Sequence, residues 1–340
     1  MRTKTALLFS IAALATFASG VTAKADISLN GGGSSFDLPA FTKWFQAYRS
    51  VDSSVSFNYQ PNGSGFGQSS MLNQTVDFGA SDFTMDDAKL AKSTNGPILQ
   101  IPIVAGAVVI SYNLPGNPKL KLDGEIIADI YLGNITKWND PRIVALNPDK
   151  NLPDLDIVTV HRSDTSGTSY IFSDYLSAVS KQWASQVGRS GSPMWPNGLG
   201  GKANAGVAGQ VKQLPGAVGY IELAYAVENH LPYAKLKNHD GDYVEATPGS
   251  VSAALATATI PDDFRFTMVN APGAKSYPIA GVSWMLLYQN QKDSVKGAAI
   301  VKFAKWIVTE GQTISPTLEY APLPKSVQER ILAAIDTIKM

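Results

Sequence analysis

The sequence predicts an α/β protein of two lobes, each built on a mixed, mostly parallel sheet flanked by helices. Short apolar strands alternate with amphipathic segments along the whole chain, and this alternation is typical of parallel sheets covered by helices. Two long β-rich runs, residues 98–113 and 277–288, fit strands that carry the chain from one lobe to the other and back. We therefore expect a two-strand hinge, with residues 26–112 and 280–340 in lobe 1 and residues 113–279 in lobe 2.

Residues 1–25 have the pattern of a secretory signal peptide. Arg2 and Lys4 precede an apolar run at 6–17, and the segment ends in the Ala-x-Ala cleavage site 23–25. The chain has no cysteine, so it has neither a disulfide frame nor a residue for lipid attachment after the leader. These features predict an exported protein of the bacterial periplasm that is not lipid-anchored.

The balance of charge excludes some partners. The 28 Lys and Arg residues equal the 28 Asp and Glu residues, so neither a basic nucleic-acid-binding patch nor an acidic tail is expected. The mature chain has no uninterrupted apolar stretch long enough to cross a bilayer. Its length allows two cores of ordinary domain size, and ligands favour the cleft between two such bodies.

The chain opens with three short strands, each followed by a polar turn. Residues 27–30 form a predicted strand, followed by the glycine-rich turn 31–36 and a helix with aromatic residues at helical spacing. Alternating apolar residues at 55–59 predict a strand that runs into a second glycine-rich turn, 61–67. Residues 76–82 fit a short strand that ends on the carboxylate of Asp82.

The second half continues this pattern. Asp123 is expected to cap a helix that extends to Tyr131, and the chain then breaks into a loop at 138–141. Further predicted elements are a strand at 157–160 followed by a helix, a helix ending near Leu214, a strand at 217–221, a helix at 222–229, a hairpin turn at 239–242, and helices at 295–309 and 326–338.

Residues 161–169 carry the strongest chemical signal. Ser166 to Ser169 fall in the first turn of a predicted helix, where backbone N–H groups lack internal partners and the helix dipole is positive. Arg162 adds a fixed charge with a planar donor fork, and the hydroxyls of Ser166, Thr168 and Ser169 add more donors. This pattern predicts half of an oxyanion site. The alternative is a well-capped helix with an Arg–Asp pair at the surface.

Two other turns have the same character. The segments 33–36 (Gly-Ser-Ser-Phe) and 63–65 (Gly-Ser-Gly) each open a helix with hydroxyls and with a glycine that lets the backbone approach a ligand. Together with residues 166–168 and Arg162, they indicate a small oxyanion held mainly by dipoles.

Motifs of common enzyme classes are missing from the sequence. It contains no P-loop, no His-Glu-x-x-His zinc motif and no Gly-x-Ser-x-Gly nucleophile elbow. Its three histidines are scattered, so we expect no metal and no other cofactor. A Ser166 nucleophile with His161 as its base leaves a hydrolytic alternative open, although His161 fits better as a strand-end residue.

The carboxylate of Asp82 would repel a bound anion unless something compensates for the like charges. Phosphate at neutral pH keeps at least one proton that Asp82 can accept, whereas sulfate has none. A buried carboxylate facing sulfate would cost roughly 2 to 5 kcal/mol, which corresponds to discrimination of about tens-fold to thousands-fold. The alternative for Asp82 is a helix-capping residue in a loop.

Over essentially its whole mature length, the chain resembles a known family, the periplasmic phosphate-binding proteins of ABC-type phosphate importers. The most specific motifs are Val-Asp-Phe-Gly-Ala-Ser-Asp at 76–82 and Arg-Ser-Asp-Thr-Ser-Gly-Thr-Ser at 162–169. The resemblance also rests on residues 31–36, 130–133, 138–140, 198–202 and 214–220. It implies a two-lobed (type II, venus flytrap) fold whose lobes close around phosphate.

The resemblance also implies a set of ligand-binding residues. These are Ser34, Ser35 and Phe36 of the first turn, Ser64 of the second, Asp82, and Arg162, Ser166, Gly167 and Thr168. Asp164, two residues after Arg162, is expected to orient the guanidinium rather than touch the ligand. The chain departs from the family pattern in two places: Asp37 stands where many relatives have proline, and the second turn reads Gly-Ser-Gly-Phe-Gly at 63–67 where many relatives read Gly-Ser-Ser-Gly-Gly, so Gly65 replaces a serine and Phe66 a glycine. Asp37 suits a helix cap, yet it brings a negative charge near the mouth of the site.

These observations predict a binding protein without enzymatic activity. By resemblance, it would hand inorganic phosphate to an import complex of two transmembrane permease proteins with ATPase subunits, and we expect a monomer that binds no nucleic acid. Two alternatives use the same anion site: an exported phosphatase-like hydrolase, and a phosphate-sensing or adhesion protein.

Overall fold

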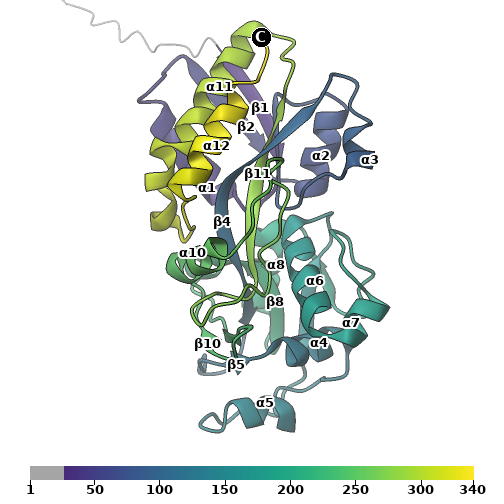
Figure 1. Ribbon diagram of the computed structural model, residues 1–340. Helices are drawn as coiled ribbons and strands as arrows, with labels where there is room; N and C mark the ends of the chain where they lie inside the picture. Colours follow the sequence, from purple (N-terminus) through teal and green to yellow (C-terminus); the bar gives the residue numbers. More distant parts are fainter. Residues whose placement is uncertain (1–26) are drawn as a thin grey trace, which may run out of the picture.

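A computed structural model describes residues 27–340 (Figure 1). The predicted signal peptide lies outside the described residues. The chain forms two lobes, one above the other in Figure 1, and the long strand β4 (Ile98–Tyr112) runs from one into the other. The two-lobed α/β fold predicted from the sequence is confirmed. Among residues 27–340, no helix has the length and apolar character needed to span a membrane.

The larger sheet runs through both lobes in the order β2-β1-β3-β11-β4-β8-β6-β7. Its two ends are parallel: β1 pairs with β2 and β3, and β6 pairs with β7 and β8. Its middle is antiparallel, because β11 lies between β3 and β4 and because β4 also pairs with β8. The remaining strands are β1 (Ile27–Gly33), β2 (Val55–Gln60), β3 (Phe78–Ser81), β6 (Val158–Arg162), β7 (Leu199–Gly201), β8 (Ala217–Glu222) and β11 (Ala280–Tyr288).

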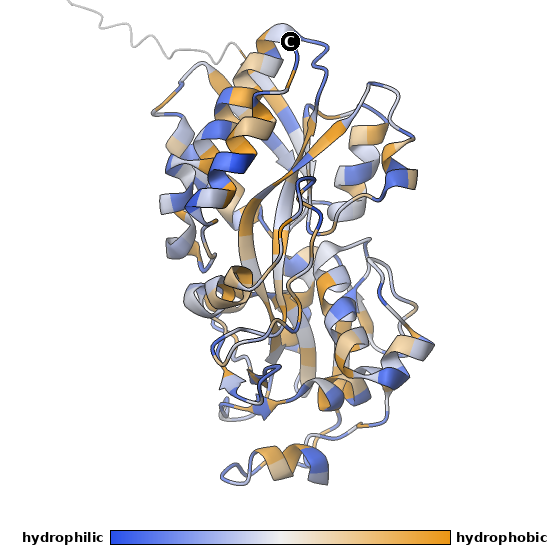
Figure 2. Ribbon diagram, viewed as in Figure 1, coloured by the Kyte–Doolittle hydropathy of each residue, from blue (hydrophilic) through white to orange (hydrophobic). Residues whose placement is uncertain are grey.

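The two long apolar runs of the sequence are the strands β4 and β11. All nine residues of β11 are buried, as are nearly all of β4, which explains why these runs lack polar alternation. Figure 2 shows hydrophobic colour along these central strands and hydrophilic colour on outer helix faces. β4 pairs with β11 through residues 98–107 and with β8 through residues 108–112, so the sheets expected in each lobe form one hydrogen-bonded sheet. The division of the chain at residues 112 and 280 stays a prediction.

A β-bulge interrupts the pairing of the two central strands. Ser283 pairs with Val104 and Trp284 pairs with Pro102, so Ile103 is the extra residue. Pro102 has no N–H to donate, and a bulge is one of the few places in a central strand that tolerates proline. The irregularity therefore falls at Ser283, a residue that contacts the candidate site.

The helices flank both lobes. In Figure 1, α1, α11 and α12 lie on one side of the upper lobe and α2 and α3 on the other, while α4, α6 and α7 cover the lower lobe. Their bounds are α1 (Leu38–Tyr48), α2 (Ser64–Leu72), α3 (Asp87–Leu90), α4 (Gly124–Leu132), α5 (Pro141–Leu146), α6 (Gly167–Val179), α7 (Lys181–Gln186), α8 (Ala203–Gln213), α9 (Leu223–Glu228), α10 (Pro248–Ala256), α11 (Ser294–Val308) and α12 (Lys325–Ile335).

Local signals in the sequence predicted several boundaries. Asp123 caps α4 by accepting a hydrogen bond from Ile126 N at 2.9 Å, as expected. The predicted turn at 239–242 joins β9 (Lys235–Lys237) to β10 (Tyr243–Val244) in an antiparallel pair, which extends through β5 (Lys121–Leu122) into a small second sheet. The loop expected at 138–141 ends in a further helix, because Asp140 caps α5.

Candidate functional site

The first wall of the site is the turn between β1 and α1. Ser34 Oγ accepts a hydrogen bond from Phe36 N at 2.8 Å, and Ser34 O accepts one from the hydroxyl of Tyr59 at 2.7 Å. Gly33 has φ +145°, and an added Cβ would lie 2.0 Å from the carbonyl oxygen of Ala80. Only glycine fits this approach of β1 to β3, so the turn residues Ser34 to Phe36 lie buried beside the end of β3.

Asp82 and Ser64 meet at this edge of the upper lobe. Asp82 directly follows β3, and Ser64 is the first residue of α2. Ser64 Oγ accepts a hydrogen bond from Asp82 N at 3.0 Å and donates one to Asp82 Oδ2 at 3.2 Å. The alternative role of Asp82 as a helix cap is wrong, since the cap of α3 is Asp86.

The surroundings of Asp82 disfavour its charged form. Asp82 is only 3 % exposed, and burial raises its pKa to about 6. Hydrogen bonds from Ser34 and Ser283 and the positive charge of Arg162 oppose this rise of the pKa.

Asp37 and Phe66, which depart from the family pattern, both have defined places. Asp37 precedes α1, but its side chain makes no capping hydrogen bond, so the suggested capping role is wrong. It lies fully buried against Ser283 in β11, with Asp37 Oδ2 2.6 Å from Ser283 Oγ. The Phe66 ring packs on the backbone of β1, where a Cβ at Gly32 would lie 2.7 Å from it.

The opposite wall comes from the lower lobe. Arg162 ends β6, and its side chain is 1 % exposed, so the alternative of a surface Arg–Asp pair is wrong. Its Nη1 donates to Thr168 Oγ1 at 3.1 Å, and its Nε donates to Asp164 Oδ1 at 2.8 Å. Burial opposes ionisation of Asp164, but the hydrogen bonds and charge of Arg162 outweigh it and lower the pKa of that carboxyl. Asp164 thus fixes the orientation of the guanidinium by accepting hydrogen bonds from its Nε and Nη2.

The first turn of α6 reaches across to the upper lobe. Ser166 caps the helix by accepting a hydrogen bond from Ser169 N at 3.1 Å. Gly167 N donates to Ser64 Oγ at 3.1 Å. A Cβ at Gly167 would lie 2.4 Å from both Cβ and Oδ2 of Asp82. The structure therefore brings together the three turns identified in the sequence, with Gly167 of α6 packed closely against Asp82.

The sequence analysis missed Asn204 and Tyr225, which also join the lobes. Asn204 in α8 donates from Nδ2 to Ser35 Oγ at 3.0 Å and to Thr168 Oγ1 at 3.2 Å. The hydroxyl of Tyr225 in α9 donates to Ser35 O at 2.7 Å. The run Gly198 to Lys202 was a signal for a turn before a helix, but spacing along the chain did not show that the next side chains reach Ser35.

The arrangement around His161 does not favour a hydrolytic dyad. The imidazole stacks on Trp195 with ring centroids 4.8 Å apart, and its Nδ1 lies 3.1 Å from Arg162 O. The hydroxyl of Ser166 accepts its hydrogen bond from the backbone of α6. Within residues 27–340, His161 makes no hydrogen bond to Ser166.

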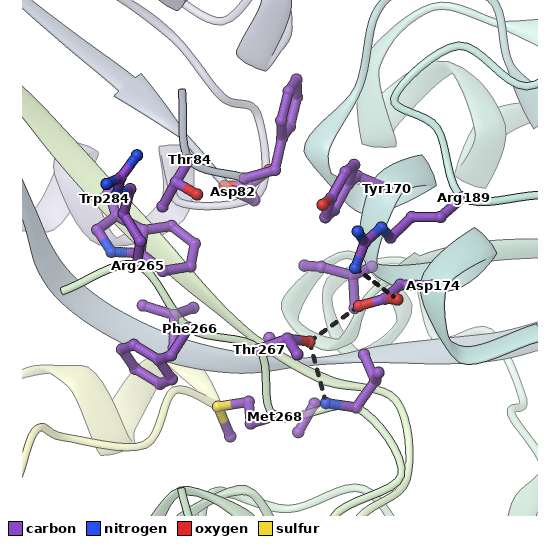
Figure 3. Close-up of a pocket in the computed structure, with 16 residues that line it drawn as sticks. Asp82, Thr84, Tyr170, Asp174, Arg189, Arg265, Phe266, Thr267, Met268 and Trp284 are labelled. Atoms are coloured by element: carbon purple, nitrogen blue, oxygen red, sulfur yellow. Dashed lines mark hydrogen bonds and ion pairs between the residues drawn. The ribbon is translucent and has the colours of Figure 1, made fainter. Parts of the chain in front are cut away.

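A cavity of about 270 Å³ lies beside this site, between α6, β11 and the chain segment around Phe266 (Figure 3). Asp82 is the one predicted site residue in its lining. Two cations lie at this cavity, and each is already paired: Arg189 with Asp174 at 3.3 Å, and Arg265 with Asp87 and Asp263. The cavity is thus an approach to Asp82 and is separate from the Arg162 cluster.

Comparisons with known proteins identify the family. Residues 20–310 match the model of the PBP superfamily domain. Phosphate-binding protein PstS of Xylella fastidiosa (strain Temecula1) is 40 % identical over 313 residues, covering 90 % of this chain and 84 % of the relative. PstS of Pasteurella multocida is also 40 % identical, over 96 % of this chain and 93 % of the relative.

Solved structures show the same fold. A high-affinity periplasmic phosphate-binding protein, PfluDING, solved with bound phosphate, matches with a TM-score of 0.75 at 19 % identity, covering 90 % of this chain and 93 % of that chain. A putative phosphate ABC transporter substrate-binding protein from Clostridium perfringens, also with bound phosphate, matches with a TM-score of 0.64 at 20 % identity, covering 87 % and 100 %. By its sequence relatives and its fold, the chain belongs to the PstS family of phosphate-binding proteins.

Proposed function

We propose that this protein binds inorganic phosphate between its lobes in the periplasm and delivers it, as a monomer, to an ABC-type import complex of two transmembrane proteins with ATPase subunits. One observation carries the proposal: a buried carboxylate, a buried guanidinium and the first turn of a helix converge where the lobes meet. We call this contact the seam; it consists of Ser64, Asp82, Arg162, Gly167 and Thr168. Gly167 N donates to Ser64 Oγ, and a Cβ added at Gly167 would collide with Asp82, while Arg162 reaches Thr168 in the same turn. We assign phosphate binding to Ser34, Ser35, Phe36, Ser64, Asp82, Arg162, Ser166, Gly167 and Thr168, with Asp164 as the support of Arg162.

The chemistry of this seam suits a protonated tetrahedral oxyanion. The amides of α6, the guanidinium and the hydroxyls supply donors to anion oxygens. The ionised form of Asp82 has no proton to donate, so it demands one from the ligand. Phosphate meets this demand and sulfate does not, which makes Asp82 the selectivity group of the proposed site. Because donors come from both lobes, an anion that bridges them favours the closed arrangement.

Titration calorimetry of the mature protein with phosphate and with sulfate tests the proposal. We expect tight phosphate binding with one site per chain, and sulfate binding that is weaker by roughly two orders of magnitude. Asp82→Asn should bring the two affinities closer together, since a carboxamide donates to either anion. Asp77→Asn is the matched control: Asp77 lies in the same run but pairs with Lys296 outside the seam. Tight sulfate binding by the wild type, or an unchanged ratio in Asp82→Asn, would refute this role of Asp82.

Two further assays separate the alternatives. A hydrolase would release product from a chromogenic phosphate ester and would lose this activity in Ser166→Ala. A sensing or adhesion protein would bind phosphate but would not restore phosphate uptake to cells that lack their own phosphate-binding protein. We expect no turnover, and restored uptake when the cognate permease is present.

A further inference from the structure

Three polar side chains form a row behind the seam, and the function proposed above uses only one of them. Ser283 of β11 stands between two carboxyl groups, with its Oγ 2.6 Å from Asp37 Oδ2 and 2.8 Å from Asp82 Oδ1. Asp37 and Ser283 are fully buried, and Asp82 is nearly so. The three residues come from the start of α1, from β11 and from the end of β3.

The number of protons in this row is limited. A serine hydroxyl has one proton, so it can donate to one carboxylate only. If both acids were ionised, one of the two short contacts would set an oxygen lone pair against a negative oxygen with no proton between them. A consistent row therefore contains at least one protonated acid, which donates to Ser283; when the other acid is ionised, it accepts from Ser283.

The groups around each acid decide which one holds the proton. The Tyr59 hydroxyl lies 3.3 Å from Asp37 Oδ1, but its single proton points to Ser34 O at 2.7 Å. Asp82 accepts from Ser64 in addition to Ser283, and the charge of Arg162 acts on it. Burial and the negative charge of Asp82 raise the pKa of Asp37 well above its ordinary value.

The other titratable groups near the row do not change this assignment. Tyr225 and Tyr320 feel the charge of Asp37, and Glu222 feels that of Asp82. Burial raises the pKa of each of these three groups, so none of them supplies a positive charge to hold Asp37 ionised.

We propose that Asp37 is a second carboxyl group of the phosphate site, a positioning residue that stays protonated and donates through Ser283 to Asp82. This inference rests on the proposed function. The wall behind the anion then carries one negative charge, and Asp82 is fixed as the acceptor for the ligand proton. An ionised Asp37 would add a second negative charge behind Asp82 and would weaken the binding of any anion.

Infrared spectroscopy of the ligand-free protein at about pH 8 tests the proton directly, because a protonated carboxyl group has a carbonyl band that a carboxylate lacks. The carbonyl band of Asp37 should be present in the spectra of the wild type and of Asp82→Asn. It should be missing from the spectrum of Asp37→Asn. Glu222, another buried acid whose pKa burial raises, contributes its own band, which Glu222→Gln identifies. A wild type without a band from Asp37, or a band that is lost in Asp82→Asn and kept in Asp37→Asn, overturns the proposal.

Proton linkage in phosphate binding gives a second measurement. Calorimetry at about pH 8 in buffers of different ionisation enthalpy should show equal proton uptake by the wild type and by Asp37→Asn. If Asp37 were ionised in the free protein, the incoming anion would draw a proton onto it, and the wild type would take up nearly one proton more. That outcome overturns the proposal.

The pH dependence of the phosphate Kd can be compared with the pH dependence of the infrared band. In the wild type, the phosphate Kd should begin to rise, by up to about tenfold per pH unit, at the pH where the Asp37 band disappears. Asp37→Asn should lack this rise. A rise in the wild type while the band persists contradicts the role of Asp37. If phosphate gives no heat with either protein, the proposed function fails, and the infrared result on the ligand-free protein still decides the state of Asp37.

Discussion

The proposed selectivity lowers the stability of the fold at one residue, Asp82. Its acceptor atoms are useful to a protonated ligand only when the carboxyl is ionised, yet burial favours the neutral form. A site that demands a charge in a buried place therefore lowers the stability of the fold, as functional sites commonly do. The free energy of unfolding should reveal this cost in the absence of ligand.

Asp82→Asn should stabilise the ligand-free protein at neutral pH. The pKa of Asp82 is about 6 in the fold against an ordinary 3.8, so the folded wild type loses stability as pH rises from about 4 to 6 and stays lower above that range. Asparagine avoids this loss, and after some loss of hydrogen bonding the gain should be roughly 1 to 3 kcal/mol. Urea unfolding at about pH 8 and about pH 4 measures it. A gain that is equal at both pH values would contradict the assignment.

Arg162→Lys should weaken phosphate binding by about 10- to 100-fold. Lysine cannot bind Asp164 through two nitrogens and reach Thr168 at the same time, and charge-assisted hydrogen bonds are worth about 1.5 to 3 kcal/mol each. The matched control is Arg142→Lys, because Arg142 binds Asp140, also two residues away, on the surface with 47 % of its side chain exposed. Calorimetry should show an unchanged phosphate Kd in the control. Equal losses in both variants would show that the effect is not specific to the seam.

Some residues near the site could be predicted from the sequence, and others could not. The serine turns and Asp82 could be predicted because hydroxyls, glycines and a carboxylate follow strands in a recognisable pattern. Ser283 could not, because it lies within a strand of buried residues and meets Asp37 and Asp82 only through the fold. The burial of Asp37 was also hidden, since an aspartate before a helix ordinarily indicates a cap.

At the scale of elements, the first turn of α6 is one of the parts of the lower lobe that meet the upper lobe. Ser166 caps it, and Gly167 presents its amide to Ser64. Cap residues and apolar spacing placed the start of this helix correctly. The bulge between β4 and β11 had no comparable signal, because the register of two strands depends on residues far apart in the chain.

Gly167→Ala should raise the phosphate Kd by more than about tenfold, although alanine favours helices by about 1 kcal/mol over glycine. The added Cβ would lie 2.4 Å from Asp82 atoms and 2.5 Å from Ser64 Oγ, so the α6 turn must move away from the upper lobe. Gly209→Ala in α8 is the control, because no atom lies within 4 Å of its added Cβ. Calorimetry and thermal unfolding should show lost affinity in the first variant, and raised stability with unchanged affinity in the second. Unchanged affinity in Gly167→Ala would remove this turn from the site.

At the scale of the whole molecule, the lobes are joined by the central strands and by hydrogen bonds across the seam. Gly65 N donates to Thr165 O at 3.0 Å, and Ser35 receives donors from Asn204 and Tyr225. The passage of β4 from one lobe to the other could be predicted from a long apolar run. These contacts could not, because they join residues that are distant in sequence and that become neighbours only in the folded molecule.

Tyr225→Phe should weaken phosphate binding by about two- to tenfold, because it removes one hydrogen bond, worth about 0.5 to 1.5 kcal/mol, between the lobes. Tyr112→Phe is the control: its buried hydroxyl donates to Pro118 O at 2.6 Å on the lower-lobe side of the seam. The control should lose stability without losing affinity, as calorimetry and urea unfolding would show. A phosphate Kd that is unchanged in Tyr225→Phe would separate this contact from binding.

The position of β11 in the sheet has a consequence for an incompletely synthesised chain. β11 lies between β3 and β4, although both precede it by roughly half of the chain. A nascent chain that has reached residue 279 contains every motif that identifies the family, yet it lacks Ser283 and leaves the facing edges of β3 and β4 without a partner. Such edges are templates for association with other chains. A product truncated at residue 279 should therefore aggregate rather than persist as a half-formed binding protein.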